Sequence, residues 1–221
     1  MGNISRVSSN FDALRMHHFQ FFGMVVVISF LSFLLYPSRR RMDSPSVLYG
    51  MLHLGSFGAN FGAQLWVTLV AGLTMFYSLP RHMFGKVQSR LFPMFFLWSL
   101  VCSAITLSTF LVQHPWETLE TAQLVQVASL SICFVTAALN SLVVSPLIVS
   151  AMLKTFKMEV DAGVGDVVGY ADMKELKKNP QYFESYRMFR RCHGVSAMLV
   201  VTSLIANNVY LYFLTSLCLP L

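Results

Sequence analysis

Five long stretches of this chain carry no charged side chain, and this feature limits the fold more than any other. No Asp, Glu, Lys or Arg occurs in residues 16–38, 44–80, 91–116, 121–153 or 192–221. An uncharged apolar stretch of about 18 or more residues is long enough to cross the hydrocarbon layer as a helix. A globule of 221 residues has too little interior to bury five such stretches. The sequence therefore predicts an integral membrane protein with four or five transmembrane helices.

The composition supports a membrane protein and argues against other classes. Hydrophobic residues make up 55% of the chain and charged residues 12%, whereas a soluble domain carries about 25% charged residues. The net charge is +6, but the basic residues lie in loops, where they set topology and face lipid headgroups. No nucleic-acid-binding module is recognisable, so we expect no nucleic-acid partner. No GxSxG, P-loop, HExxH or paired carboxylate is present, so we expect no enzymatic activity.

The apolar stretches predict an all-α fold, a four-helix bundle in the membrane with one additional N-terminal hydrophobic helix. Residues 1–48 hold the N-terminal tail and this extra helix, whose apolar segment is 19–36. Residues 49–221 form the four-helix transmembrane domain, with a cytosolic loop at 154–192. The four expected segments are about 49–78, 91–113, 124–153 and 194–219.

Two prolines predict local features of these segments. Pro146 should kink the third segment of the domain, because proline removes a helical hydrogen bond. Asn179 and Pro180 should start a helix, with the asparagine as its cap. We expect the first part of that helix to lie at the membrane surface before it leads into the last segment.

The distribution of Lys and Arg indicates the orientation. If all five segments cross, one side holds 13 of the 16 Lys and Arg residues, and that side should be cytosolic. The other side holds only Arg39, Arg40 and Arg41, which conflict with this orientation. A first helix that does not cross, or one overruled by the four-helix core, would resolve the conflict. We expect a membrane of the secretory pathway or the plasma membrane.

The segment at 49–78 has two different faces when it is drawn as a helix at about 100° per residue. The polar face carries His53, Asn60 and Gln64. The opposite face carries Gly55, Gly58 and Gly62. Gly58 and Gly62 form a GxxxG pair, which lets another helix approach closely. We therefore expect this helix to pack through its glycines and to be central to the bundle.

Three amides, those of Gln64, Asn140 and Asn207, fall near mid-bilayer, and we expect them to form one polar layer inside the bundle. One interpretation is a small-solute or ion site, since polar residues are costly in a membrane. The other, which we favour, is hydrogen bonding between helices, worth about 0.6–2 kcal/mol. No carboxylate or Lys lies at that depth, which argues against a proton-coupled transporter.

The histidines fall into two pairs by their position. His53 and His114 should lie near the outer face, and His82 and His193 near the cytosolic face. Either pair has the ligand chemistry for a metal ion or a haem. Histidines at a membrane interface more often form hydrogen bonds. We therefore expect no cofactor, and keep haem or a soft metal as the alternative.

A short basic loop follows the second segment and carries a set of motif residues. These residues are Pro80, Arg81, His82, Gly85 and Gln88. One interpretation is an element that docks a partner or binds lipid. The other, which we favour, is a positively charged anchor with a tight turn at Pro80. The expected partners are therefore the lipid bilayer and proteins that bind the cytosolic loops.

The residues between His53 and Pro93 carry a family resemblance. The matching residues are His53, Gly62, Gln64-Leu65-Trp66-Val67-Thr68, Gly72, Ser78-Leu79-Pro80-Arg81-His82, Phe84-Gly85, Val87-Gln88-Ser89 and Leu91-Phe92-Pro93. Further matches are Gln113-His114, Trp116, Asn140, Pro146, Phe189-Arg190 and His193-Gly194. Together they resemble the transmembrane protein 205 family over roughly residues 50–215.

The resemblance implies a multi-pass membrane protein with four transmembrane helices and no established activity. Residues 1–48 have no counterpart, so the extra helix departs from the family pattern. The family name is associated with cellular resistance to platinum compounds. The resemblance thus implies a role in membrane trafficking or in the export of solutes or soft-metal compounds.

Overall fold

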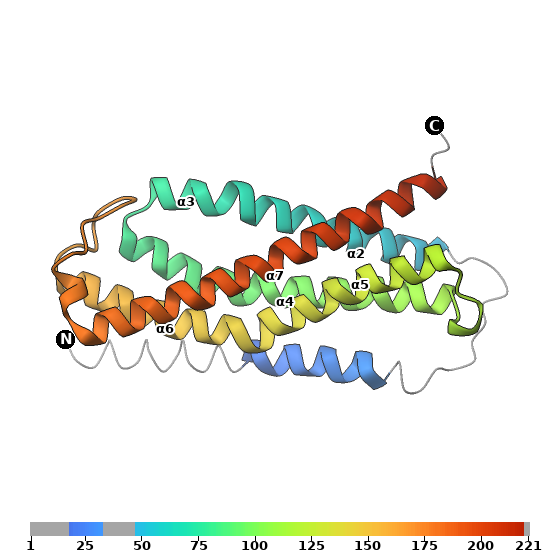
Figure 1. Cartoon of the computed structure of the whole chain (residues 1–221), viewed down its shortest axis with the longest axis horizontal. Coiled ribbons are helices and arrows are strands. Elements are labelled where there is room, and N and C mark those ends of the chain that lie inside the picture. The colour runs from blue at the N-terminus through green and yellow to red at the C-terminus, as the bar shows by residue number, and fades with distance from the viewer. Residues whose placement is uncertain (1–17, 33–46, 219–221) are drawn as a thin grey trace.

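The computed structural model describes residues 18–32 and 47–218. Figure 1 shows long helices that run along one common axis. Four helical segments are long and apolar enough to cross a membrane, and a shorter apolar helix, His18–Ser32, precedes them. The predicted all-α architecture, a four-helix membrane bundle with an added N-terminal helix, is confirmed. The arginines at 39–41 lie outside the described residues.

The four spans are divided into shorter helical elements. The first span contains α2 (Val47–Leu65), the π-helix η1 (Trp66–Ala71) and α3 (Gly72–Ser78). The second span is α4 (Arg81–Gln113). The third contains α5 (Thr121–Leu139), the π-helix η3 (Asn140–Val144) and α6 (Ser145–Asp161). The fourth is α7 (Pro180–Cys218), and the 3-10 turns η2 (Trp116–Thr118) and η4 (Leu176–Lys178) lie in connections.

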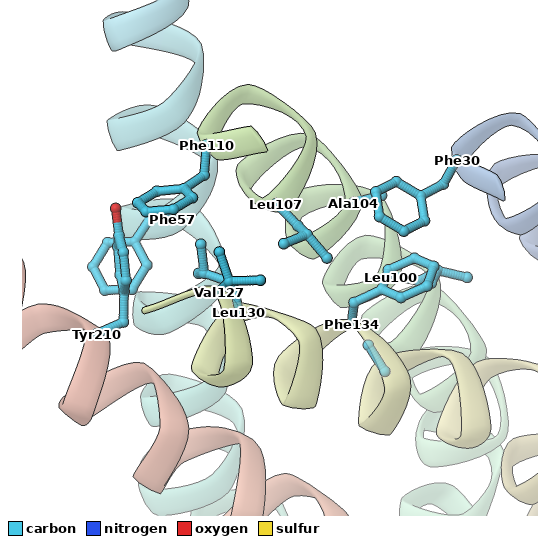
Figure 2. Close-up of a cluster of buried hydrophobic side chains, with 11 residues drawn as sticks. Phe30, Phe57, Leu100, Ala104, Leu107, Phe110, Val127, Leu130, Phe134 and Tyr210 are labelled. Atoms are coloured by element: carbon cyan, nitrogen blue, oxygen red, sulfur yellow. The ribbon is translucent and has the colours of Figure 1, made fainter. Parts of the chain in front are cut away.

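The core lies between α4, α5 and α7. α4 packs against α2, α5 and α6, while α7 packs against α5 and α6. Figure 2 shows the apolar cluster at one end of this core, which includes Leu107, Phe110, Leu130 and Tyr210. Many large apolar side chains on the outside of the helices are exposed, as lipid contact requires. We call the end that holds residues 79–80 and 162–179 the loop end, and the end that holds residues 114–120 the far end.

The helix α2 lies at the edge of the bundle, not at its centre. In the most apolar window of the first span, Val47–Ser78, only 11% of the residues are buried, against 61% for α4. Its buried residues include the polar set His53, Asn60 and Gln64. A Cβ added at Gly55, Gly58 or Gly62 would meet nothing within 4 Å. The expected central position, and glycine packing against helices of this chain, are therefore wrong, because the polar face turns inward and leaves the glycines outside.

The third span is irregular immediately before Pro146. Proline has no N–H, so the carbonyl of Leu142 lacks its usual donor four residues along the helix. The chain takes the π-helical form η3 at this point, and Gln20 Nε2 donates to the Leu142 carbonyl at 3.4 Å. The expected kink at Pro146 coincides in position with this π-helical segment, and a bend of the helix there stays a prediction. The Leu142 carbonyl is thus one point of contact between the N-terminal helix and the bundle.

The last helix starts where the sequence predicts. Asn179 Oδ1 accepts a hydrogen bond from the N–H of Gln181 at 2.9 Å, and α7 begins at Pro180. Figure 1 shows α7 as one continuous helix. The expectation that its first part lies along the membrane surface is wrong. The reason is that Tyr182, fully buried, bonds to Glu159 of α6 and holds this part against the bundle.

Close packing at Gly85 yields a prediction about stability. A Cβ at Gly85 would lie 2.3–2.8 Å from three ring atoms of Phe156, so the ring must move. Overpacking of this kind costs about 1–3 kcal/mol, more than the ~1 kcal/mol that Ala gains over Gly in a helix. We expect Gly85→Ala to lower the midpoint of thermal unfolding in detergent. Gly58→Ala, which meets nothing, is the control and should leave the midpoint unchanged or raised.

Candidate functional site

A buried ion pair joins α4 to α6 at the loop end. Arg81 Nε donates to Glu159 Oε2 at 2.9 Å, and Arg81 Nη2 donates to Glu159 Oε1 at 3.0 Å. Tyr182 of α7 donates its hydroxyl to Glu159 Oε1 at 2.9 Å. The side chain of Glu159 is 0% exposed, so one carboxylate ties three helices together. Two-pronged pairing with arginine is the strongest geometry for a carboxylate in such a place.

The same arginine and its neighbour hold the loop between α6 and α7. The backbone N–H of Arg81 donates to the Val167 carbonyl, and that of His82 donates to the Gly165 carbonyl, both at 3.0 Å. Arg81 Nη1 reaches the Gly169 carbonyl at 3.1 Å, and His82 Nδ1 lies 2.9 Å from the Gly165 carbonyl. The first N–H groups of a helix need outside acceptors. Here the loop carbonyls provide them, so the start of α4 and the loop fix each other.

The expected basic loop is wrong for most of its motif residues, because Arg81, His82, Gly85 and Gln88 lie in the first turns of α4 and Pro80 is its N-cap. These residues contact the rest of the protein. Pro80 forms a backbone bridge with Val168, Gly85 lies under the ring of Phe156, and Gln88 is 4% exposed. Sequence reasoning singled out Arg81 but missed Glu159 and Tyr182. Arg81 and Glu159 are 78 positions apart, and nothing in the local pattern around Glu159 identifies its partner.

Two of the three mid-bilayer amides are in direct contact. Asn207 Nδ2 donates to Gln64 Oε1 at 3.0 Å, and Gln64 Nε2 donates to Ser203 Oγ at 3.0 Å. The thiol of Cys133 lies 3.2 Å from Asn207 Oδ1, which adds α5 to the layer. These contacts link α2, α5 and α7 by side-chain hydrogen bonds, as amides between membrane helices commonly do.

Asn140 lines the same cavity as Gln64 but does not bond to it. The cavity lies between α2, α4, α5 and α7, and its lining includes Gln64, Ser99, Asn140 and Ser203. The space open to the centre of a water molecule is about 10 Å³. This is close to the minimum of about 10–15 Å³ for one water. The three amides therefore lie in one layer, with a water-sized cavity beside it.

His53 is part of a separate polar cluster nearer the far end. Its Nδ1 lies 2.9 Å from Thr109 Oγ1, and its Nε2 contacts the hydroxyl of Tyr210. The Thr109 hydroxyl donates to the Ile105 carbonyl at 2.8 Å, so its oxygen accepts from His53 Nδ1. This assigns the proton to Nδ1 and makes Nε2 the acceptor of the Tyr210 hydroxyl. Both ring nitrogens of His53 are thus engaged within the protein.

The other histidines contact different parts of the chain. His114 stacks on Phe110 with ring centroids 4.3 Å apart, and its Nδ1 lies 3.1 Å from the Phe110 carbonyl. His193 packs against the rings of Phe92 and Phe189. Within residues 18–32 and 47–218, no group of three or more His, Cys, Asp or Glu side chains is arranged to hold a metal ion. Metal or haem binding at these histidines stays a prediction.

The buried ion pair makes a prediction about the loop end. Arg81→Met leaves Glu159 buried without its partner, a change that costs about 3–5 kcal/mol. We expect a lower unfolding midpoint and faster tryptic cleavage in the loop after Lys174, Lys177 and Lys178. Glu175→Gln removes only the exposed pair with Lys178 and should change neither measurement. Unchanged cleavage and stability in Arg81→Met would show that the ion pair does not hold the loop.

Comparisons with known proteins agree with this architecture. A family model described as a domain of unknown function (DUF4149) matches residues 55–157. The chain is similar to transmembrane protein 205 of Danio rerio, with 30% identity over 175 residues that cover 77% of this chain and 93% of that protein. No solved structure matches the chain. With this identity over nearly the whole length of the relative, the chain belongs to the transmembrane protein 205 family.

Proposed function

We propose that this chain is a non-enzymatic membrane protein that supports membrane trafficking or the export of solutes or soft-metal compounds through protein partners. The observation that supports this best is the buried cluster of Arg81, Glu159 and Tyr182. It fixes residues 162–179, which we call the loop platform, at the loop end of the bundle. Loops held by a rigid scaffold are where binding residues concentrate.

The energetics of the cluster favour a role in positioning the platform. Removing the Glu159 carboxylate from water is expensive, and its pairing with Arg81 offsets that cost without a large net gain. The main effect of such a pair is therefore to fix the relative positions of the groups it joins, and its net contribution to the free energy of folding is small. The surface so defined includes Val167, Val168 and Tyr170, which are 39%, 47% and 83% exposed. Exposed apolar side chains on an ordered loop are suited to contact with another protein.

The polar layer supports action through partners over direct transport. Gln64 and Asn207 bond to each other, and the cavity beside them has room for about one water. A solute of larger size would need the helices to separate at this layer and to lose these hydrogen bonds. Hydrogen bonding between helices accounts for the amides without a transport path.

A paired cellular and reconstituted assay tests this proposal. We expect cells that express the chain to accumulate less platinum after exposure to a platinum(II) complex, measured by mass spectrometry. The purified protein in proteoliposomes should take up no more of the complex than protein-free vesicles. Tyr170→Ser should weaken the cellular effect because it removes the most exposed apolar group of the platform.

Two further variants decide between partner-dependent action and direct transport. Tyr212→Ser changes another exposed tyrosine, 69% accessible, which lies on α7 far along the helix from the platform, and it should leave the cellular effect intact. Gln64→Leu should also leave it intact. Uptake into proteoliposomes that Gln64→Leu abolishes would refute the proposal and identify the chain as a transporter.

A further inference from the structure

Four buried side-chain oxygens have no hydrogen-bond partner among the described residues. They are Gln88 Oε1, Ser99 Oγ, Asn140 Oδ1 and Ser145 Oγ. All four belong to α4 or to the continuous segment η3–α6, which packs against α4. A polar group buried without a partner is costly, and lipid supplies no replacement for water. The helices α4 and η3–α6, which pack together, therefore carry buried oxygens that would be stabilised by additional hydrogen bonds.

Two of the residues that carry these oxygens line the one-water cavity. Ser99 and Asn140 are 3% and 2% exposed, and both border the cavity beside the polar layer. Ser203 borders it too. Its oxygen accepts from Gln64 Nε2, and its hydroxyl also interacts with the thiol of Cys133. The cavity wall thus combines an acceptor at Asn140 with hydroxyl groups that both donate and accept.

The backbone at this place is also irregular. Asn140 is the first residue of the π-helix η3, and its N–H is shared between the carbonyls of Thr136 and Ala137. Single π-helical turns inside α-helices are frequent at functional sites. The cavity, the unpaired oxygens and the π-helical turn are separate features, and all of them meet at Asn140.

We propose that this cavity binds a single ordered water molecule, which donates to Asn140 Oδ1 and accepts from the hydroxyl of Ser99 or Ser203. Its size matches about one water, and a buried water needs 2–4 polar partners, which these groups supply. The bound water joins α4 and η3 to the amide layer of α2 and α7. This inference is independent of the proposed role in trafficking or export.

The chemistry of the wall favours water over a cation. The lining residues Gln64, Ser99, Thr136, Asn140 and Ser203 provide neutral oxygens, and the rest of the lining is apolar. No carboxylate is among them. A charge near mid-bilayer is expensive without an opposite charge or a water-filled path. A neutral molecule that both donates and accepts satisfies the site without that cost.

The direct test is solid-state NMR of the labelled protein in lipid bilayers, with magnetisation transferred from water protons to nearby side chains. We expect transfer to the side-chain amide of Asn140. Asn208 is the control, because it is an exposed asparagine in the same span as Asn207 and bonds to the Leu204 carbonyl. It should receive no such signal. Absence of transfer to Asn140 overturns the proposal.

The thermal unfolding midpoint of Asn140→Leu gives a second test, because a cavity that holds water and a dry cavity predict changes of opposite sign. If water bridges the site, Asn140→Leu loses those bonds and lowers the unfolding midpoint by roughly 3 °C or more. If the site is dry, the same change removes an unpaired oxygen, and the midpoint stays or rises. Asn208→Leu should not lower it. The unfolding midpoint should be the same in sodium and in choline buffers. A midpoint that is higher in sodium, with the difference absent in Asn140→Leu, would show that the cavity binds a cation and would overturn the proposal.

Discussion

Hydrocarbon offers no hydrogen-bond partner to a helix that crosses it, and the rest of this structure depends on that constraint. Backbone groups are paired within the helices, and polar side chains turn toward other helices. The α2 helix shows the effect most clearly, because its polar residues are buried while its glycines are exposed. Many polar side chains are consequently buried, while many large apolar side chains face outward.

Polar contacts lie at three depths, and each has a different character. The loop end has an ion pair with a tyrosine, the middle has amides and hydroxyls, and the far half has a histidine between Thr109 and Tyr210. Within residues 18–32 and 47–218, the fully buried charged side chain is Glu159 at the loop end. The amide layer has no charge to compensate, so neutral hydrogen bonds are sufficient there.

The number of spans, the start of α7 and the position of the irregularity at Pro146 could be predicted because each depends on local composition. Counting from the ends of the uncharged runs places Gln64, Asn140 and Asn207 at one level; in the structure Gln64 bonds to Asn207 and shares a cavity with Asn140, and their depth in the membrane stays a prediction. The pairing of Arg81 with Glu159 could not be predicted, because it joins positions 78 residues apart. The glycine pattern gave a wrong expectation for α2. GxxxG spacing allows a second helix to approach closely, but it does not establish that a second helix packs against that face. Hydrogen bonding by the opposite face decided which side of α2 is buried.

Pro146 and Gln20 form a single unit although they belong to helices far apart in the sequence. The proline withholds a donor from the Leu142 carbonyl, and the glutamine, 122 positions before that carbonyl, supplies one. An alanine at position 146 would return the N–H and satisfy the carbonyl from inside its own helix. The third span would become more regular, yet the N-terminal helix would lose its polar attachment to the bundle. A change that restores one backbone hydrogen bond would thus weaken the attachment of another helix.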